Sequence, residues 1–589
     1  MSETKTPFPE FVGPSYQGRS KRFESQRCVN LYPEIDEAGG SGTSSPGKNQ
    51  QNMVLIGTPT CAYPVTVGTG PIRSVYTLSN LELTMIVSGD QIFQLSAPNA
   101  VPVALAGNLN TTTGPVQAAD NGVQVLWIDG QYGYYQTIGT GSGSIESTNT
   151  LVGGSGYAPA SGSVVYTDVP LTGGSGNNAS ADITVDNGTI TNVVLINPGS
   201  GYVVSDVLSC DPAFDGIGAG SGFSVTVATV SSGPFLTQIT SDNFYPSQTI
   251  TFQDGYFILN KTGTTDFFLS DLYSIDFLPL NEEAKTGNSD ILVGLISVNR
   301  QLYLGGSATM EMWWNQGQSG SSPFARQDGR FSQQGLLAPA TLAKLQEQFF
   351  WLSSNAQGGG VVMGLTGGMP TRVSTHAVEY SIQNFGVNLS ESTAFAYQQE
   401  GHYFYCLNVP GLNTTWVYDM STNLWHERQS VINGNIGRNL AEGHALLNGI
   451  HIVGDYQSGN VYQYQLDNYT DNGEMVPRIR QLLHSALYGY NLFYNLIEID
   501  FQFGVGLVDN GTNTQNNVNP TCTLEVSKDG GKTFGVPIIG QLGKIGAYTT
   551  RCRFARCGYG RDLVFRFTIT DAVNVQILSA MMDVEKGTQ

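Results

Sequence analysis

The stretch TITFQDGYFILN at residues 249–260 decides the fold that we expect for this chain. Its two apolar runs, TITF and YFIL, are joined by Gln253-Asp254-Gly255, and Asp-Gly supplies the positive φ that a tight hairpin turn needs. A second pair of apolar runs flanks Asn299-Arg300. The whole stretch from 239 to 317 alternates strand and turn and holds no sustained 3.6-residue apolar pattern. It predicts four-stranded β-units that bury their faces against neighbours of the same kind.

Composition places the chain among all-β proteins with many turns. It has 589 residues, 72 of them glycine, and only 13% are charged. The formal net charge of −20 argues against a protein that binds nucleic acid by neutralising phosphates. There is no 18-residue apolar run, so we expect no transmembrane helix and no membrane insertion. The first residues, MSETKTPFPEF, lack the apolar core of a signal peptide.

Hairpin-rich units recur along the chain, beginning near residues 72, 116, 239, 291, 342, 390 and 441. When an interruption at about 150–235 is set aside, the starts lie about 37–52 residues apart, which matches the roughly 40–50 residues of a four-stranded propeller blade. We therefore predict an interrupted β-propeller of about seven blades over residues 71–475. A pair of β-sandwiches with accidental spacing is the alternative.

The interruption has its own internal repeat. Gly-Ser-Gly-Tyr occurs at 154–157 and again at 199–202, and each copy ends in an alternating strand. This predicts a small two-repeat β-module at 150–235, inserted in a loop between blades, with surface decoration or lateral contact as its role. Beyond the propeller the strands lengthen and alternate, which predicts a C-terminal antiparallel β-sandwich at 476–589.

The first 70 residues have the composition of an N-terminal arm. They include the run GGSGTSSPGKNQQN, which is typical of a flexible polar segment. Positive charge gathers there in an otherwise acidic protein, at Arg19, Lys21, Arg22 and Arg27. Two interpretations stay open: a solvated loop, or a docking arm that binds an acidic partner.

One short motif matches the Asp-box pattern of a β-hairpin turn, in which the aspartate side chain binds backbone amides. Its residues are Ser527, Asp529, Gly531, Thr533 and Phe534. Sialidases carry several such boxes together with an arginine cluster, whereas we find one box outside the propeller. We therefore expect this box to shape a turn and to take no part in catalysis.

The sequence indicates no catalytic residue, metal site or cofactor. Cys552 and Cys557 lie five positions apart, which on a regular strand places them on opposite faces, and no second pair follows as a zinc site requires. The six histidines form no evident triad. Glu282 and Glu283 are paired in a polar segment, where solvation is a simpler interpretation than glycoside hydrolysis. The seven cysteines are odd in number and scattered, which indicates free thiols made in a reducing compartment.

Three motifs, in their order along the chain, point to a family. They are CVNLYPE at 28–34, QDGYFILN at 253–260 and LGGSATMEMW at 304–313. Together they resemble the packaged-DNA stabilisation proteins of short-tailed bacteriophages, also called tail hub or nozzle proteins. The resemblance covers about 1–137 and 236–470 and, more loosely, the C-terminal domain, whereas the insert departs from it.

The resemblance implies a non-enzymatic structural protein of the virion tail, synthesised in the host cytoplasm. Six copies would form a ring below the portal and its adaptor, extending the DNA channel and helping to retain and later release the genome. A tail needle or plug would close the ring, and tailspikes or tail fibres would be further partners. The acidity fits this role, because a negative wall repels phosphate and lets DNA pass without specific binding.

Two other classes remain as alternatives. A propeller-fold glycosidase, or a protein that binds surface polysaccharide, would need polar groups that converge in one pocket, including a carboxylate pair for hydrolysis. A secreted adhesin is the other, against which the missing signal peptide weighs.

Overall fold

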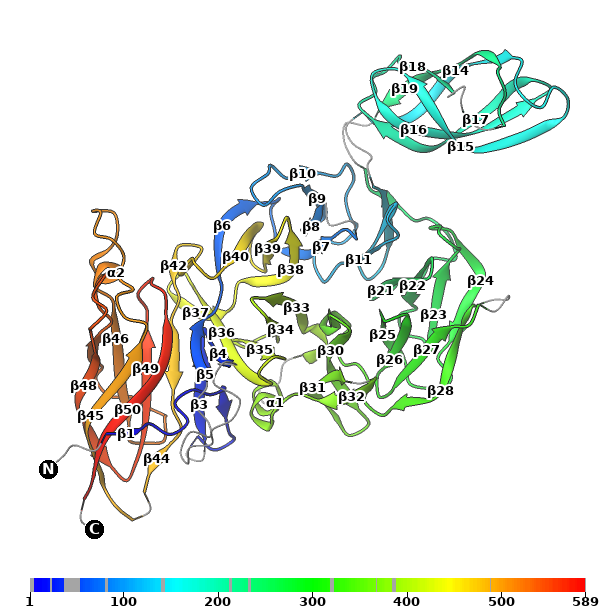
Figure 1. Ribbon diagram of the computed structural model, residues 1–589. Helices are drawn as coiled ribbons and strands as arrows, with labels where there is room; N and C mark the ends of the chain where they lie inside the picture. The colour runs from blue at the N-terminus through cyan, green and yellow to red at the C-terminus, as the bar shows by residue number, and fades with distance from the viewer. Residues whose placement is uncertain are drawn as a thin grey trace, which may run out of the picture.

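A ring of β-sheets with a second all-β body beside it makes up the computed structural model of the chain (Figure 1). It describes residues 5–21, 24–35, 53–79, 83–138, 143–210, 214, 216–230, 235–317, 322–366, 368–383, 388–487 and 489–587. Two short α-helices, α1 (His376–Gln383) and α2 (Gln515–Val518), accompany the strands of these segments. In the described part, no helix is long and apolar enough to cross a membrane.

Seven four-stranded units of the described chain form the blades of a propeller, which confirms the predicted fold (Figure 1). Six of them are separate sheets, and the strands of the other are part of a larger sheet described below. Each blade is an antiparallel meander, and we number the blades in chain order. The four strands of a blade follow one another in the chain, except that the last strand of blade 2 comes after the insert and the last strand of blade 7 comes from the N-terminal part of the chain. Blade 1 contains β7 (Ile72–Thr77), β8 (Thr84–Ser88), β9 (Gln91–Leu95) and β10 (Val103–Ala104). Blade 2 contains β11 (Gln117–Asp120), β12 (Gln124–Ile128), β13 (Gly133–Thr137) and β20 (Thr237–Gln238). Blade 3 contains β21 (Ile250–Gln253), β22 (Tyr256–Asn260), β23 (Asp266–Ser270) and β24 (Phe277–Ala284).

The other four blades complete the circle and bring the chain back to its first strands. Blade 4 contains β25 (Leu292–Val298), β26 (Gln301–Gly306), β27 (Met310–Asn315) and β28 (Phe324–Ser332), and blade 5 contains β29 (Ala343–Leu345), β30 (Gln348–Asn355), β31 (Gly358–Thr366) and β32 (Met369–Arg372). Blade 6 contains β33 (Thr393–Gln399), β34 (His402–Asn408), β35 (Thr415–Asp419) and β36 (Leu424–Ile432). Blade 7 contains β38 (Ala441–Leu447), β39 (Ile450–Asp455), β40 (Asn460–Gln465) and β6 (Thr60–Thr66).

Local turn chemistry sets the hairpins within the blades. Asp254 and Gly255 both have positive φ, 51° and 91°, and join β21 to β22 as the sequence predicted. Asn299 and Arg300 do the same between β25 and β26, with φ of 53° and 60°. Buried aromatic and aliphatic side chains of adjacent sheets then fill the spaces between blades.

The insert interrupts blade 2 itself, between its third and fourth strands, and not a loop between blades. Its sheet order is β14-β19-β18-β15-β16-β17, and Figure 1 shows it standing off from the ring. Each repeat supplies three strands, and the first strand of each pairs with the last strand of the other. The strands are β14 (Ile145–Ser155), β15 (Ser163–Gly173), β16 (Asn177–Asp186), β17 (Thr189–Ser200), β18 (Val207–Cys210) and β19 (Ser221–Val230).

The repeated motifs of the insert lock its two halves together. Tyr157 of the first repeat lies against Gly220 of the second, where a Cβ atom would come within 2.4 Å of its ring. Tyr202 lies in the same way against Gly176 of the first repeat, at 2.5 Å. Both tyrosines are buried in a core that belongs to the insert alone. One repeat therefore cannot bury its tyrosine without the other.

The C-terminal domain is an antiparallel sandwich, as predicted, but its sheets also contain N-terminal strands. One sheet has the order β4-β5-β50-β45-β48, with β1 paired to β50, and the other contains β43-β49-β46-β47, with β44 paired to β49. The strands are β1 (Thr6–Pro7), β4 (Leu31–Ile35), β5 (Met53–Gly57), β43 (Arg478–Gln481), β44 (Ser485–Ala486), β45 (Leu492–Phe501), β46 (Thr521–Ser527), β47 (Ile538–Gln541), β48 (Cys552–Gly560), β49 (Asp562–Ile569) and β50 (Gln576–Lys586).

One continuous twelve-stranded sheet joins the propeller to the sandwich. β3 (Ser25–Val29) pairs in parallel with β36 of blade 6 and antiparallel with β43 of the sandwich. β2 (Tyr16–Gln17) pairs with β3, and β37 (Asn435–Arg438) pairs with β36. Next to this joint, β41 (Thr470–Asp471) and β42 (Glu474–Met475) form a small hairpin.

The expectation of a separate arm at 1–70 is therefore wrong for the described residues. β6 closes blade 7, and Phe8, Phe11 and Leu31 are buried in the sandwich core. The physical reason is that these short strands carry apolar residues that fit existing sheet edges, although a polar run separates them. That run, at 36–52, lies outside the described residues.

Candidate functional site

The joint between propeller and sandwich buries several polar and charged groups of the described chain. Arg480 of β43 is fully buried and donates hydrogen bonds to the carbonyl oxygens of Glu10, Phe11, Pro14 and Arg27. It also donates to Gln26 Oε1 at 2.7 Å. A guanidinium can satisfy five acceptors at once, so one side chain fastens the N-terminal segment to the sandwich.

Glu427 makes the matching contact from the propeller side. Its carboxylate, on β36, accepts hydrogen bonds from Arg27 Nε at 3.1 Å and Arg27 Nη2 at 2.6 Å. It also accepts one from Ser15 Oγ at 2.9 Å. Both charges are thus paired inside the joint, as a buried carboxylate requires.

A cleft of about 320 Å³ opens beside this joint. Four separate parts of the chain line it: the β4–β5 hairpin, the β33–β34 turn, the segment after blade 7 and a loop of the sandwich. Three carboxylates surround it, on Glu34, Glu400 and Asp467. Residues 574–576 and 56–58 complete the wall with mostly neutral groups.

Arg478 is the one cation that lines this cleft among the described residues. It is 2% exposed, and its Nε and Nη1 atoms have no hydrogen-bond partner in the described chain. Burial lowers the pKa of Arg478 to about 10, although Asp471 and Tyr469 oppose this. A buried guanidinium with free donors is costly, which marks the cleft as a place where acceptor groups can bind.

A histidine and an aspartate form a pair near the same cleft. His402 Nδ1 lies 2.8 Å from Asp419 Oδ2, and the Asp419 side chain is fully buried. Burial lowers the pKa of His402, but the hydrogen bond and charge of Asp419, with Glu34 and Glu400 nearby, outweigh this and raise it overall. The ring also packs edge-on against Tyr32, 4.9 Å away.

The four basic residues of the expected arm do not stay together. Arg27 is used inside the joint, so it cannot serve as a free docking cation. Arg19 and Lys21 are exposed at the tip between β2 and β3, where Arg19 Cζ lies 5.8 Å from the Tyr380 ring of α1. Arg22 lies outside the described residues. Arg27 lies on β3, whereas Arg19 and Lys21 lie in the turn before this strand, which composition alone does not reveal.

The Asp-box forms a turn between β46 and β47. Asp529 accepts hydrogen bonds from the backbone N–H groups of Lys532 and Thr533, each at 2.9 Å, and from Thr533 Oγ1 at 2.6 Å. Ser527 Oγ accepts from Gly531 N at 2.8 Å, and Phe534 lies 3.7 Å from the Arg566 guanidinium. The hydrogen bonds from Thr533 and Ser527 lower the pKa of Asp529. All these contacts are internal to the sandwich.

Residues considered for catalysis are engaged in structural contacts. Glu282 forms an ion pair with Lys261 at 2.6 Å on β24, beside Glu283. His484 binds Asp562 through Nδ1 and the Lys21 carbonyl oxygen through Nε2. In the described part of the chain, no group of three or more histidine, cysteine or acidic side chains could hold a metal ion.

The two cysteines of β48 correct one expectation from sequence. Cys552 and Cys557 are both buried in the sandwich core, although a regular strand would place them on opposite faces. A β-bulge explains this, because Arg556 has a φ of 55° and the register against β45 shifts there. All seven cysteines are buried, and none of them is joined in a disulfide in the described chain.

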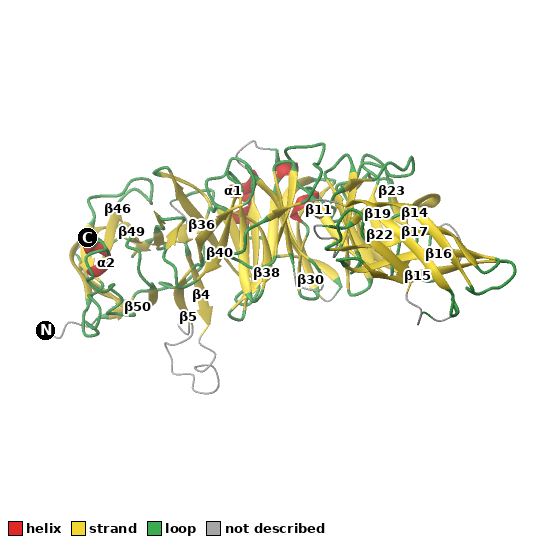
Figure 2. Cartoon of the chain, turned by 90° about the horizontal axis from the view of Figure 1, so that it is seen from above, coloured by secondary structure: helices red, strands yellow, loops and turns green. Residues whose placement is uncertain are grey.

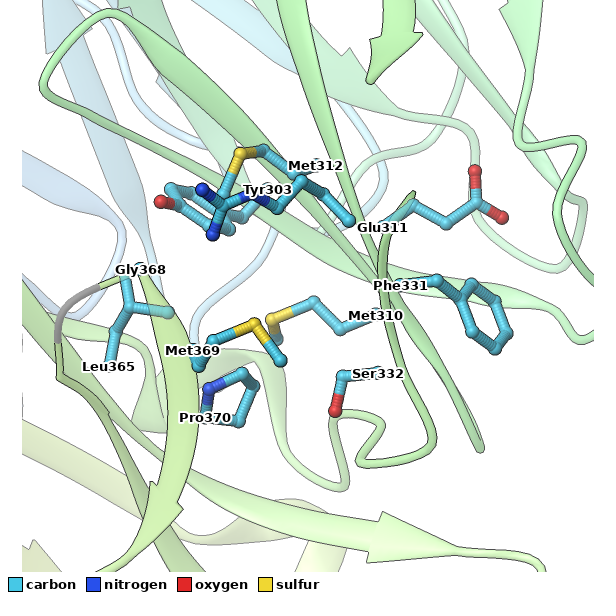
Figure 3. A pocket seen from close by; sticks show the side chains of 11 residues that line it. Tyr303, Met310, Glu311, Met312, Phe331, Ser332, Leu365, Gly368, Met369 and Pro370 are labelled. Atoms are coloured by element: carbon cyan, nitrogen blue, oxygen red, sulfur yellow. The ribbon is translucent and has the colours of Figure 1, made fainter. Parts of the chain in front are cut away.

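A small void between blades 4 and 5 is too small for a ligand (Figure 3). Its volume is about 20 Å³, room for roughly one water molecule. Met310, Met312, Met369 and Tyr303 surround it, and Figure 3 shows the Glu311 carboxylate turned away from them. The void is a packing feature between blades.

Two family models match this chain. The model described as the β-propeller of bacteriophage P22 Gp10 matches residues 205–470, and the model described as its β-sandwich matches residues 481–585. Together they cover more than half of the chain. The chain belongs to the bacteriophage P22 Gp10 family. It is therefore a phage structural protein, and the resemblance noted in the sequence is confirmed.

Comparison with other proteins adds little to the Gp10 assignment. The β-propeller domain of Cps50 (Swd1) from Myceliophteria thermophila is 7% identical, with a TM-score of 0.26, over 68% of this chain and 99% of that chain. At that score the likeness supports no argument, so the fold rests on the strand pairing. No curated protein matches the chain.

The Gp10-like motif at 304–313 has a structural task. Glu311, whose side chain is fully buried, accepts hydrogen bonds from Gly287 N at 2.7 Å and Trp313 Nε1 at 3.1 Å. Lys285 lies 3.6 Å from the same carboxylate and also binds Asp290. The segment between blades 3 and 4 is thereby held against β27.

Asp290 completes this arrangement in the Gp10-family chain. It accepts the backbone N–H groups of Ala308 and Thr309, at 2.8 and 2.9 Å, in the turn before β27. The spacing of glycine, threonine, glutamate and tryptophan in the motif thus reflects a buried polar network between two blades. The sequence showed the motif, but its partners Lys285 and Asp290 could not be assigned from spacing.

Proposed function

We propose that this Gp10-family chain is a subunit of the tail hub, or nozzle, which extends the DNA channel below the portal and its adaptor. The observation that carries the proposal is the continuous sheet from blade 6 through β3 into the sandwich. It couples two domains into one stiff body, as a subunit that must withstand the pressure of a packaged genome requires. Such a subunit would help to retain the genome and later release it.

The proposed partners are further copies in a ring of six, the adaptor, a needle or plug, and tailspikes or tail fibres. DNA would pass through without specific binding, since the chain carries a net charge of −20. The proposed role is mechanical and does not involve catalysis. In support, the described residues considered for catalysis are bound in ion pairs and hydrogen bonds of the scaffold.

The test uses phage from which the gene for this chain is deleted. DNA-filled heads should form and then lose their genome, and full-length protein added in trans should restore DNase-resistant DNA. Complete genome retention without the chain would contradict the proposal. Release of reducing sugars from host surface polysaccharide by the purified protein would instead favour the glycosidase.

A further inference from the structure

We infer that Lys285 and Asp290 condense in the folded chain into an amide between Nζ and Cγ, which is an intramolecular isopeptide bond. The structure shows the two side chains before this step, as an ion pair beside Glu311. The inference goes beyond the proposed function and does not depend on it. It assigns a chemical role to a buried lysine that the hub does not require.

The two reacting groups and the groups that polarise them are already in place. The Lys285 side chain is fully buried, and its Nζ contacts Oδ1 of Asp290. Since Oδ1 is bonded to Cγ, this contact brings the amine close to the carbon that it attacks. The backbone N–H groups of Ala308 and Thr309 donate to the other oxygen, Oδ2, at 2.8 and 2.9 Å. Two donors on one oxygen stabilise the negative charge that develops there when the carbon becomes tetrahedral.

The protons have two paths from the amine to the leaving oxygen. Nζ starts with three protons as an ammonium, the amide keeps one, and the other two leave with Oδ1 as water. Thr309 Oγ1 accepts a hydrogen bond from Nζ at 3.0 Å and donates one to Oδ1 at 2.7 Å, so it can relay the first proton. The Glu311 carboxylate, with Oε1 3.6 Å from Nζ, can carry the second.

The ion pair is the resting state, so the step is slow. Burial raises the pKa of Asp290, but hydrogen bonds from Lys285 and from the turn before β27 outweigh this and lower it. The amine must therefore lose protons before it can attack. A slow rate suffices, because the bond has to form only once in each molecule.

Burial favours the amide once it has formed. The side chains of Lys285 and Glu311 are fully buried, and Asp290 is only 9% exposed. Among the described residues, both carboxylates have their ion pairs with this one ammonium. Buried ions are costly, and condensation turns two of them into a neutral group. The water that is released enters the solvent, and the dry site then opposes hydrolysis.

The bond closes the connection between β24 and β25, where the chain passes from blade 3 to blade 4. Figure 2 shows β22 and β23 of blade 3 on the side of the ring away from the sandwich strands β46, β49 and β50. Blades 3 and 4 are also separate from the twelve-stranded sheet that joins the two domains. The bond therefore secures a part of the ring that the sandwich does not brace.

Mass spectrometry of the denatured full-length chain after tryptic digestion tests the bond. Trypsin does not cut after a lysine whose Nζ is in an amide, so cleavage after Lys261 and Arg300 should release residues 262–300 as one peptide. That peptide should be lighter than its sequence by one water. Cleavage after Lys285 into two peptides of sequence mass would overturn the inference. Loss of one water with cleavage after Lys285 would indicate a succinimide at an aspartate and would also overturn it.

Substitutions test the chemistry that we assign to each group. Lys285→Arg should abolish the bond, whereas the matched control Lys261→Arg should retain it. In a time course after cell-free synthesis, Glu311→Gln and Thr309→Val should each slow formation by about tenfold or more, and Thr309→Ser should restore it. Glu283→Gln, a glutamate two positions before Lys285, should react at the normal rate.

The unaltered chain decides whether the bond exists, so the result does not depend on how well a variant folds. Near-UV circular dichroism identifies the variants that keep the native packing, and only their rates are compared. Normal rates in both Glu311→Gln and Thr309→Val would overturn the proton paths proposed for the step.

Discussion

Arg27 and Glu427 lie 400 positions apart in the sequence, yet their side chains meet through two hydrogen bonds, of 3.1 and 2.6 Å. The pair spans the boundary between the first strands of the chain and blade 6. It therefore holds together segments that lie far apart along the chain. Its geometry, two N–H groups facing two carboxylate oxygens, is the strongest arrangement for such a contact.

Substitution Glu427→Ala should lower the free energy of unfolding by about 2–4 kcal/mol. It leaves Arg27 partly buried without its counter-charge and removes one of the two acceptors of the Ser15 hydroxyl. Urea unfolding followed by fluorescence measures the change. Asp328→Ala serves as the control, because Asp328 is 94% exposed and pairs weakly with Arg326. Equal stability of the two variants would contradict this interpretation of the joint.

Deletion of residues 1–35 should prevent folding, in contrast to what an independent arm would allow. The deletion removes β3 from the continuous sheet and the Phe8 and Phe11 rings from the sandwich core, and it leaves Glu427 and Arg480 unpaired. We expect insoluble protein on expression. Arg19→Ala with Lys21→Ala is the matched control and should remain soluble with an unchanged melting temperature. A soluble truncated protein with native β-sheet signal would refute the assignment.

The insert should be removable. β13 and β20 pair with each other, Tyr134 opposite Gln238, so a short Gly-Ser loop in place of residues 139–234 can close blade 2 as a hairpin. The main melting transition should remain within about 2 °C, since the insert has a separate core. A fragment of residues 143–230 should fold alone, whereas a fragment of either repeat should not. Loss of the propeller transition in the deletion would count against this organisation.

Asp529→Ala should lower the melting temperature of the sandwich without affecting attachment to heads. The substitution removes the acceptor for four N–H and O–H donors of the turn, which come from Ser527, Lys532 and Thr533. Because the pKa of Asp529 is lowered in the folded chain, its contribution is present above pH 4 and is lost as the pH falls further. Thermal unfolding between pH 2 and 7 measures this loss, which should be absent from the variant. Unchanged melting curves would show that the turn forms without this carboxylate.

His402 should make stability depend on pH in the opposite sense. Its pKa is raised in the folded chain, so its contribution is complete below about pH 6.5 and is lost as the pH rises through the folded value. The difference in melting temperature between the original chain and His402→Asn should shrink from pH 6 to pH 9. His451→Asn provides the contrast, because burial lowers the pKa of His451. A difference that grows with pH would contradict the ion pair with Asp419.

The hairpins and the domain types could be predicted from sequence because they depend on neighbouring residues. Asp254-Gly255 and Asn299-Arg300 adopt positive φ wherever two strands must reverse, and Asp529 binds amides within four positions of itself. The repeat of such units predicted a propeller, and alternating longer strands predicted a sandwich. None of these conclusions required knowledge of which distant strands pair.

The sequence by itself determined the strands, the turns, the number of blades and the internal repeat of the insert, since each is set by local backbone preference and periodicity. Only the tertiary structure decided that β6 closes blade 7, that β3 joins two domains and that a bulge at Arg556 turns Cys557 toward the core. It also decided that Glu34, Glu400, Asp467 and Arg478 meet at one cleft. The physical reason is that any short apolar strand can pair with any open sheet edge. The choice among edges is made by burial and charge pairing between residues hundreds of positions apart, which no local pattern records.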